Sequence, residues 1–89
     1  MPEVTVQVRN RVGLHARPAA VLVQEASKYR SEIKIRLGEK LANAKSILDV
    51  LTLGVESGSV ITLITEGDDA AEALTAIHQL VEAGFGEVE

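Results

Sequence analysis

A histidine and an arginine stand two residues apart in the stretch Gly13-Leu14-His15-Ala16-Arg17-Pro18, where a helix is predicted to begin. The first N–H groups of a helix have no partner inside the helix and lie at the positive end of its dipole, so a helix start attracts anions. The guanidinium of Arg17 could hold a phosphate by two parallel hydrogen bonds, and the backbone of Ala16 could bind it as well. These residues predict a phosphate site.

His15 could serve this site as a nucleophile, or it could be a loop histidine that only caps the helix. Imidazole is largely neutral near pH 7, and neutral imidazole can take a phosphoryl group on a ring nitrogen. That step requires no metal and no cofactor from this chain. Gly13 is also open to two interpretations, as a turn residue with positive φ or as a place where a ligand approaches the backbone closely. The residues alone leave both questions open.

The helix that follows must position this pair, and Pro18 fixes where it begins. Proline is tolerated in a helix only within the first turn, where no intrahelical hydrogen bond is lost. We predict a helix over residues 16–28, because apolar side chains recur there at helical spacing. These side chains are Ala19, Leu22, Val23 and Ala26. His15 is therefore expected at the mouth of the helix.

Four segments have the period-two alternation of strands, namely residues 4–8, 32–37, 40–44 and 60–65. Gly38-Glu39 predicts a type II′ hairpin between the second and the third, with Lys34, Arg36 and Lys40 pointing to water. The last segment is almost continuously hydrophobic, which favours a central place in the sheet.

A second helix is expected between Ser46 and Gly54, with Ser46 as its cap and Asp49 reaching back in the manner of a capping box. A third begins after Asp69, its expected cap, with Glu72 in its first turn. Asp68, Asp69 and Glu72 could be mistaken for a metal or acid–base cluster, but their spacing suits capping better. Gly84-Phe85-Gly86 ends this helix, and the acidic terminus beyond it is expected to fray.

The order βαββαβα predicts an α+β domain over residues 1–89, an open-faced β-sandwich with three helices on one face of a four-stranded, mainly antiparallel sheet. The second helix is apolar nearly all round, more than one buried face requires. Its apolar residues are Ile47, Leu48, Val50, Leu51 and Leu53. Part of that surface must be exposed or covered by a partner.

Charge is segregated along a chain whose net charge is −4. Residues 1–45 hold all nine basic and four acidic side chains, while the remainder holds nine acids and no base. Arg9, Arg11 and Arg17 could make a positive neighbourhood around His15, although the segregation could also be ordinary drift. An acidic protein with two aromatic residues does not suggest a nucleic-acid partner.

The remaining composition argues for a cytoplasmic protein without a metal site. There is no cysteine, and no apolar run approaches the ~20 residues of a membrane span. His78 lies off the apolar stripe of the third helix and is expected on the surface. It has no second histidine at ligand spacing, so a structural metal site is not expected.

Two separate motifs resemble the HPr family, the histidine-containing phosphocarriers of the bacterial phosphoenolpyruvate-dependent sugar phosphotransferase system. One runs from Gly13 to Ala19 and continues from Val21 to Tyr29, and the other runs from Ala44 to Gly54. The resemblance also covers the length, the element order and the Gly84-Phe85-Gly86-Glu87 ending.

The resemblance implies that His15 accepts phosphate on Nδ1 from enzyme I and passes it to a sugar-specific enzyme IIA, while Arg17 steadies it. The chain would then be a monomeric carrier and not an enzyme, since no complete active site is present on it alone. Ser46 matches a serine that HPr kinase/phosphorylase modifies in many Gram-positive bacteria, where the phosphorylated form also binds a catabolite-control transcription regulator. Ile47, Leu48 and Leu51, with Ala20, match the apolar docking patch.

Val12 departs from the family, which usually has a small polar residue there that settles the loop or contacts the phosphate. Asn10 or Arg11 could substitute for it. Two other functions stay open. One is a regulatory module that works through Ser46 alone, although relatives specialised in that way lack the active histidine. The other is a small-molecule-binding regulatory domain of similar build, which would not explain His15 with Arg17.

Overall fold

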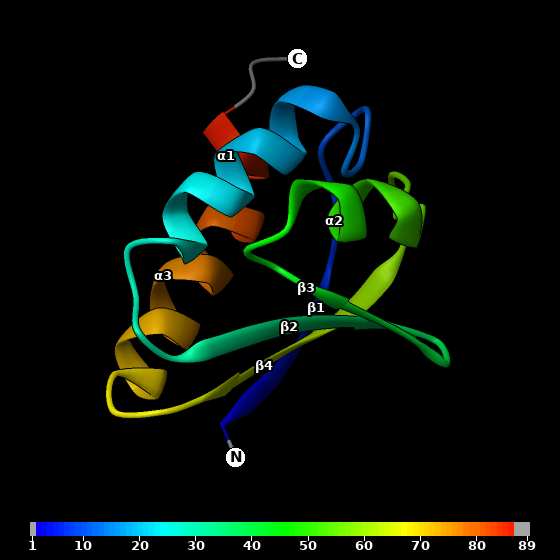
Figure 1. Ribbon diagram of the computed structural model, residues 1–89. Helices are drawn as coiled ribbons and strands as arrows, with labels where there is room; N and C mark the ends of the chain where they lie inside the picture. The colour runs from blue at the N-terminus through cyan, green and yellow to red at the C-terminus, as the bar shows by residue number, and fades with distance from the viewer. Residues whose placement is uncertain (1, 87–89) are drawn as a thin grey trace.

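One four-stranded sheet carries the architecture in the computed structural model, which describes residues 2–86 (Figure 1). The strands are β1 (Glu3–Gln7), β2 (Glu32–Leu37), β3 (Lys40–Asn43) and β4 (Val60–Glu66), in the spatial order β1-β4-β2-β3. Each neighbouring pair is antiparallel. The hydrophobic β4 lies inside the sheet, as its sequence predicts, and is paired with β1 along one edge and with β2 along the other.

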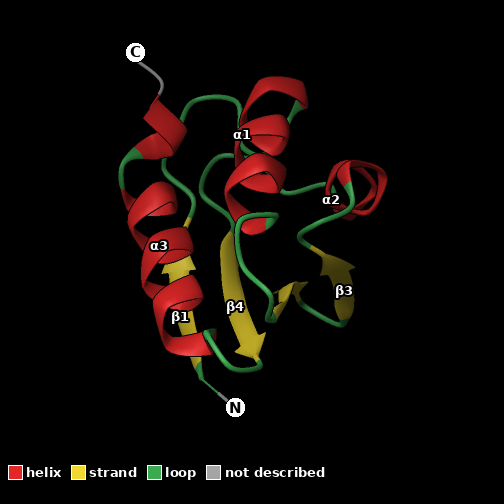
Figure 2. Cartoon of the chain, turned by 60° about the vertical axis from the view of Figure 1, so that its left-hand side comes forward, coloured by secondary structure: helices red, strands yellow, loops and turns green. Residues whose placement is uncertain are grey.

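Three helices lie side by side on one face of this sheet, with α1 between the other two (Figure 2). They are α1 (Ala16–Ala26), α2 (Ile47–Leu53) and α3 (Ala70–Glu82). The predicted fold class is therefore confirmed. The helix expected over 16–28 ends two residues earlier, and the third strand ends one residue earlier, at Asn43.

Alternation along the strands sorts side chains between the helical face and the open face. Ile33 and Ile35 are buried in the core, whereas Lys34, Arg36 and Lys40 are exposed as predicted. Gly38 has a φ of 62° while Glu39 does not have a positive φ, in agreement with a type II′ turn, since type I′ requires both.

The C-terminal end of α3 folds back on the core through Phe85. This residue is 4% exposed and adopts a φ of 58°, which only glycine adopts readily. The stop predicted at Gly84-Phe85-Gly86 is thus present, and burial of the aromatic ring stabilises the turn. The expectation that the acidic terminus frays concerns residues 87–89, which lie outside the described part of the chain.

The loop before α1 is locked to the segment after α2. The N–H of Leu14 donates to the carbonyl of Val55 at 3.0 Å, and Leu14 is 2% exposed. Gly13 has a φ of 63°, and a Cβ there would lie 2.5 Å from the Val55 carbonyl oxygen. Gly13 is therefore required both by its turn and by close approach of the chain's own backbone, so a ligand is not needed to explain it.

Asp69 does not cap α3 with its side chain, so that prediction is wrong. Its carboxylate instead accepts hydrogen bonds from the backbone N–H of Arg30, at 3.0 Å, and from the N–H and hydroxyl of Ser31. These bonds tie the start of α3 to the loop between α1 and β2. The loop between α1 and β2, which is distant in sequence, thus supplies the donors that bind the Asp69 carboxylate. The Ser31 hydroxyl, followed by the Arg30 N–H, lowers the pKa of Asp69 from 3.8 to about 2.

Replacing Gly13 should test the loop lock. Gly13→Ala adds a methyl group against the backbone of Val55 and Glu56 at a positive φ, so we expect a loss of about 3 kcal/mol in the free energy of unfolding. Gly38→Ala is the matched control, because it shares the positive φ but meets nothing within 4 Å. It should cost about 1 to 2 kcal/mol. Urea unfolding measures both, and equal losses would contradict the lock.

Asp69 should make stability depend on acid. Because the folded pKa lies below the unfolded one, its carboxylate stabilises the fold above pH 4, and this contribution is lost as the pH falls towards 2. Asp69→Asn should therefore show a flatter decline of unfolding temperature between pH 4 and pH 2 than the unsubstituted protein. Asp68→Asn is the control for removal of one negative charge. Parallel declines in all three proteins would rule out the Asp69 contribution.

Candidate functional site

His15 occupies the N-cap position of α1 with its side chain free of capping duty. Its backbone is extended, with φ −79° and ψ −165°, and the side chain makes no cap hydrogen bond. The carbonyl of His15 accepts from the N–H of Ala19 at 2.9 Å, which closes the first turn. His15 is therefore the cap of the helix by position and backbone, while its imidazole takes no part in capping and is exposed at the helix mouth.

Ala16 and Arg17 follow as the first two residues of α1, and both are exposed. Their N–H groups belong to the first turn, which has no intrahelical acceptors. The structure thus brings the three predicted residues together at one helix start. Arg17 makes no ion pair with another residue of the described range 2–86. Its guanidinium is not committed to any carboxylate in that range.

The turn beneath His15 is held from inside. The side-chain amide of Asn10, which is 3% exposed, donates to the carbonyl of Gly13 at 2.8 Å. Val12 is 39% exposed and Arg11 is exposed as well. Asn10 therefore settles the loop, one of the two tasks expected at position 12, but its burial keeps the amide away from a phosphate at His15.

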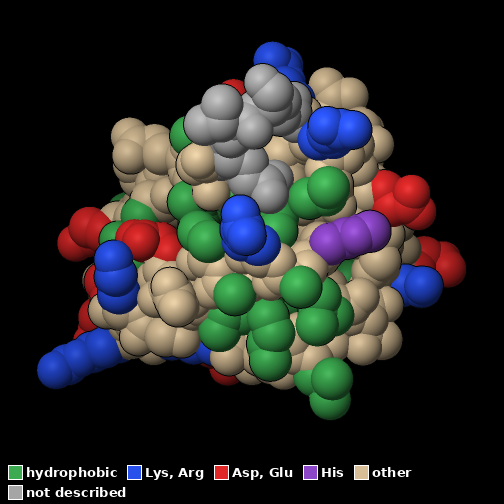
Figure 3. Space-filling view, turned by 90° about the horizontal axis from the view of Figure 1, so that it is seen from above, with side chains coloured by type: hydrophobic (Ala, Val, Ile, Leu, Met, Phe, Trp, Pro, Cys, Tyr) green, Lys and Arg blue, Asp and Glu red, His purple; other side chains and the backbone are tan. Residues whose placement is uncertain are grey.

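His15 opens onto a shallow hollow of about 350 Å³ between the start of α1 and the end of α2. Its lining consists of Leu14, His15, Ala16, Leu51, Gly54 and Glu56. Figure 3 looks onto this end of the molecule and shows a histidine at the border of a cluster of hydrophobic side chains, with basic side chains nearby. Glu56 is the residue that sequence reasoning missed, because nothing in a spacing of 41 residues signals its proximity to His15.

Ser46 is the N-cap of α2, as predicted, and its hydroxyl accepts from the N–H of Asp49 at 3.3 Å. The other half of the expected capping box is absent. The carboxylate of Asp49 accepts instead from the N–H of Asn43 at 3.3 Å, while the N–H of Ser46 donates to the carbonyl of Asn43 at 3.0 Å. Both ends of the box are therefore bound to the last residue of β3. Lys45 adds a hydrogen bond of 2.6 Å to the carbonyl of Tyr29, just beyond α1.

The surplus apolar surface of α2 is exposed. Leu48 is 72% exposed, while Ile47 and Leu51 are 42% and 40% exposed, and only Val50 and Leu53 are buried. Ala20, on the neighbouring α1, is exposed as well. Because Leu51 also lines the hollow at His15, the apolar surface of α2 reaches the histidine. These four exposed residues form what we call the apolar patch: Ala20, Ile47, Leu48 and Leu51.

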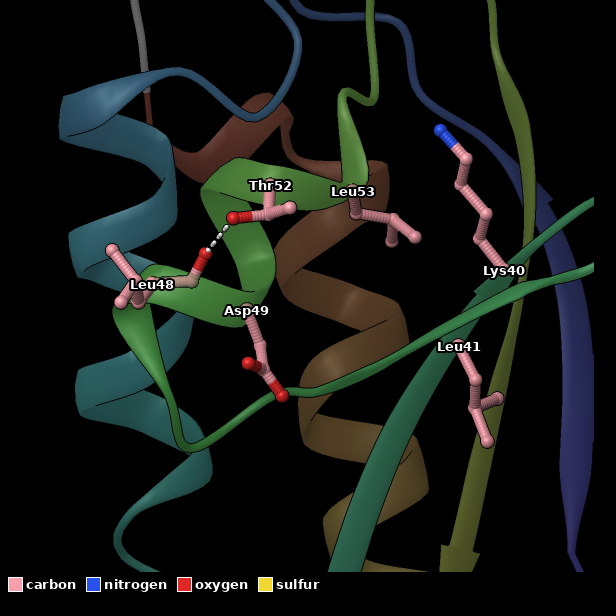
Figure 4. Close-up of a pocket in the computed structure, with 6 residues that line it drawn as sticks. All are labelled: Lys40, Leu41, Leu48, Asp49, Thr52 and Leu53. Atoms are coloured by element: carbon pink, nitrogen blue, oxygen red, sulfur yellow. Dashed lines mark hydrogen bonds between the residues drawn. The ribbon is translucent and has the colours of Figure 1, made fainter.

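A second hollow, of about 470 Å³, lies between α2 and β3 (Figure 4). Lys40 and Leu41 line it from β3, and Leu48, Asp49, Thr52 and Leu53 line it from α2. The hydroxyl of Thr52 donates to the carbonyl of Leu48 at 2.7 Å, so it is already satisfied. Unlike the hollow at His15, this one is lined by no histidine.

The other candidates behave as structural or surface residues. The ring of His78 lies 3.1 Å from the carboxylate of Glu82, one turn further along α3, and 37% of its side chain is exposed. Across residues 2–86, no group of three histidine, cysteine or acidic side chains could hold a metal ion. No helix in that range is both long and apolar enough to cross a bilayer.

Comparison with known proteins identifies the family of this chain. Residues 2–83 match the PTS-HPr family, described as the phosphorylation site of the HPr component of the phosphotransferase system. The chain belongs to the HPr family. Membership of this family supports a phosphocarrier role in the phosphotransferase system.

Relatives in this family carry two names. The HPr-like protein Crh of Halalkalibacterium halodurans is 50% identical over 82 residues, which cover 92% of this chain and 98% of the relative. The phosphocarrier protein HPr of Treponema pallidum is 45% identical over 83 residues, covering 93% and 94% of the two chains. Sequence identity alone therefore does not separate a carrier from a Crh-like protein here.

Solved structures show the same fold. HPr from Thermoanaerobacter tengcongensis superposes with a TM-score of 0.96 at 49% identity, and the match covers all of both chains. HPr from Bacillus anthracis superposes at 0.87 with 46% identity, covering 90% of this chain and 95% of the other. A dimer of the T. tengcongensis protein has also been solved, so a monomeric state is not established by the likeness.

Proposed function

We propose that the chain accepts a phosphoryl group on His15 from phosphorylated enzyme I and transfers it to a sugar-specific enzyme IIA. The observation that carries the proposal is the exposed imidazole of His15 at the start of α1. Its side chain makes no capping hydrogen bond, and Arg17 follows two residues later. A regulatory module that works through Ser46 alone would not require His15 and Arg17 at a helix start, and a small-molecule-binding domain would not require them either.

The chemistry follows from the helix start. A ring nitrogen of His15 attacks the donor phosphorus, the bond from that phosphorus to its group on enzyme I breaks as the new N–P bond forms, and the released donor group takes the proton that His15 loses. The first-turn N–H groups and Arg17 then face the phosphoryl oxygens with positive charge. No metal is needed on this side, because positioning and charge stabilisation are what such a transfer requires.

The shallow hollow suits a carrier and not an enzyme. A phosphohistidine that faces water on one side and a partner on the other must survive until the partner supplies the remaining catalytic groups. The apolar patch borders the hollow, so one protein surface can cover both His15 and α2. We propose that enzyme I and enzyme IIA dock on this shared face one after the other. The carrier would act as a monomer in the cytoplasm.

Phosphorylation by phosphoenolpyruvate and enzyme I tests the carrier function. The protein should gain one acid-labile, base-stable phosphate, and His15→Ala should lose it entirely because the accepting nitrogen is gone. His78→Ala is the control, since its ring lies on α3 beside Glu82. Labelling of His15→Ala at the level of the unsubstituted protein would refute the proposal.

A second function, regulation through Ser46, is favoured by the Crh-like relatives. Bacillus subtilis Crh, named for catabolite repression, is 42% identical over 82 residues. The hydroxyl of Ser46 stands at the start of α2, beside the exposed Ile47 of the apolar patch. A phosphate placed there by HPr kinase/phosphorylase would add about two negative charges at the edge of the docking face and would weaken docking of an acidic partner. The same phosphate could be read by a transcription regulator.

Charge at position 46 can be varied without losing the helix cap. Ser46→Asp keeps a capping oxygen and adds a charge, so it should raise the KM of enzyme I for the protein about fivefold. Ser46→Ala loses the cap but adds no charge, and its KM should stay within twofold of the unsubstituted value. Steady-state phosphotransfer kinetics measure both. Equal KM values for the two variants would remove the electrostatic effect.

A further inference from the structure

Glu56 shares the hollow of His15, although 41 residues separate them in the chain. We propose that the Glu56 carboxylate repels the phosphoryl group on His15 and so raises the free energy of the phosphorylated carrier. The inference rests on the proposed function of His15. Glu56 would then set how readily the carrier gives its phosphate away.

The backbone holds Glu56 in place at this hollow. Its N–H donates to the hydroxyl of Ser59 at 3.1 Å, and the preceding carbonyl, of Val55, accepts from Leu14. A Cβ on Gly13 would lie 2.6 Å from the Cα of Glu56, so the two backbones are in direct contact. The segment that carries Glu56 is thus fixed to the loop that carries His15. The separation of the two backbone segments is consequently set by the fold, and both side chains border the same hollow.

Glu56 has no ion-pair partner in the described part of the chain. Among residues 2–86 the ion pairs are Lys28 with Glu25 and His78 with Glu82, and neither involves this carboxylate. Arg17 does not line the hollow. A phosphoryl group on His15 would therefore meet an unpaired negative charge from Glu56 and a positive charge from Arg17.

The effect on transfer follows from Coulomb's law. A phosphoryl group bonded to the ring adds about two negative charges near pH 7, whereas the unmodified imidazole carries no negative charge. Residues that line one hollow of this size lie within the ~10 Å Debye length at 0.1 M salt, so the repulsion is only partly screened. It raises the energy of the phosphorylated form alone. In water the expected size is about a three- to fivefold shift in the equilibrium of phosphoryl exchange.

Competition for a limited amount of phosphate measures this shift directly. Equal amounts of ¹⁵N-labelled protein and unlabelled Glu56→Gln are mixed with a trace of enzyme I and with phosphoenolpyruvate sufficient for half of the sites. At equilibrium, mass spectrometry gives the phosphorylated fraction of each protein. Enzyme I only catalyses the exchange, so differences in docking cannot change this ratio. The exchange constant calculated from these fractions should favour the variant about three- to fivefold.

Two further comparisons separate charge from shape. Glu56→Asp keeps the charge and should give an exchange constant near one, and the preference of Glu56→Gln should fall towards one at 1 M salt. Glu39→Gln removes an equal charge from the distant hairpin turn and should also give a value near one.

The outcomes distinguish this inference from the function beneath it. If neither protein is labelled, the carrier function itself fails, and the role of Glu56 falls with it. If both are labelled and Glu56→Gln shows no preference, the carrier stands and the role of Glu56 is wrong. A preference that Glu56→Asp shares, or that salt leaves unchanged, would show a structural effect and would likewise overturn the inference.

Discussion

The hydrogen bond from Leu14 to Val55, with Gly13 pressed against the same backbone, is the constraint on which the site depends. It joins the loop before α1 to the segment after α2. Without it the imidazole of His15 would still precede a helix, but the end of α2 would not lie beside it. The same contact creates the hollow, brings the apolar patch to its border and places Glu56 there. One backbone contact therefore joins the proposed phosphoryl site at His15 to the proposed docking surface on α2.

Local sequence signals predicted most of the elements because each had a local physical cause. Pro18 marks the first turn of α1, Ser46 caps α2, and Gly54 ends it in the left-handed conformation with a φ of 75°. Burial then follows from period-two alternation in the strands. The fold class and the approximate bounds could therefore be derived before any coordinates were considered.

Long-range contacts are what sequence reasoning could not supply. Asp69 and Asp49 both had the spacing of capping residues, yet both carboxylates bind backbone N–H groups of other elements. A carboxylate chooses among donors that the fold brings near, and sequence spacing reveals only the local ones. Glu56 escaped notice for the same reason. His15 and Arg17 could be predicted as one site because residues two positions apart at a helix start lie close together without any tertiary contact.

The bonds that α2 makes to Asn43 also bear on the open edge of the sheet. β3 is an edge strand, and an open edge presents unpaired backbone groups on which another chain can build. Here the carboxylate of Asp49 accepts a hydrogen bond from the N–H of Asn43, and the N–H of Ser46 donates to the carbonyl of Asn43. The start of α2 thus seals one end of an edge only four residues long. The turn that carries Ser46 therefore also occupies backbone groups that an open sheet edge would leave unpaired.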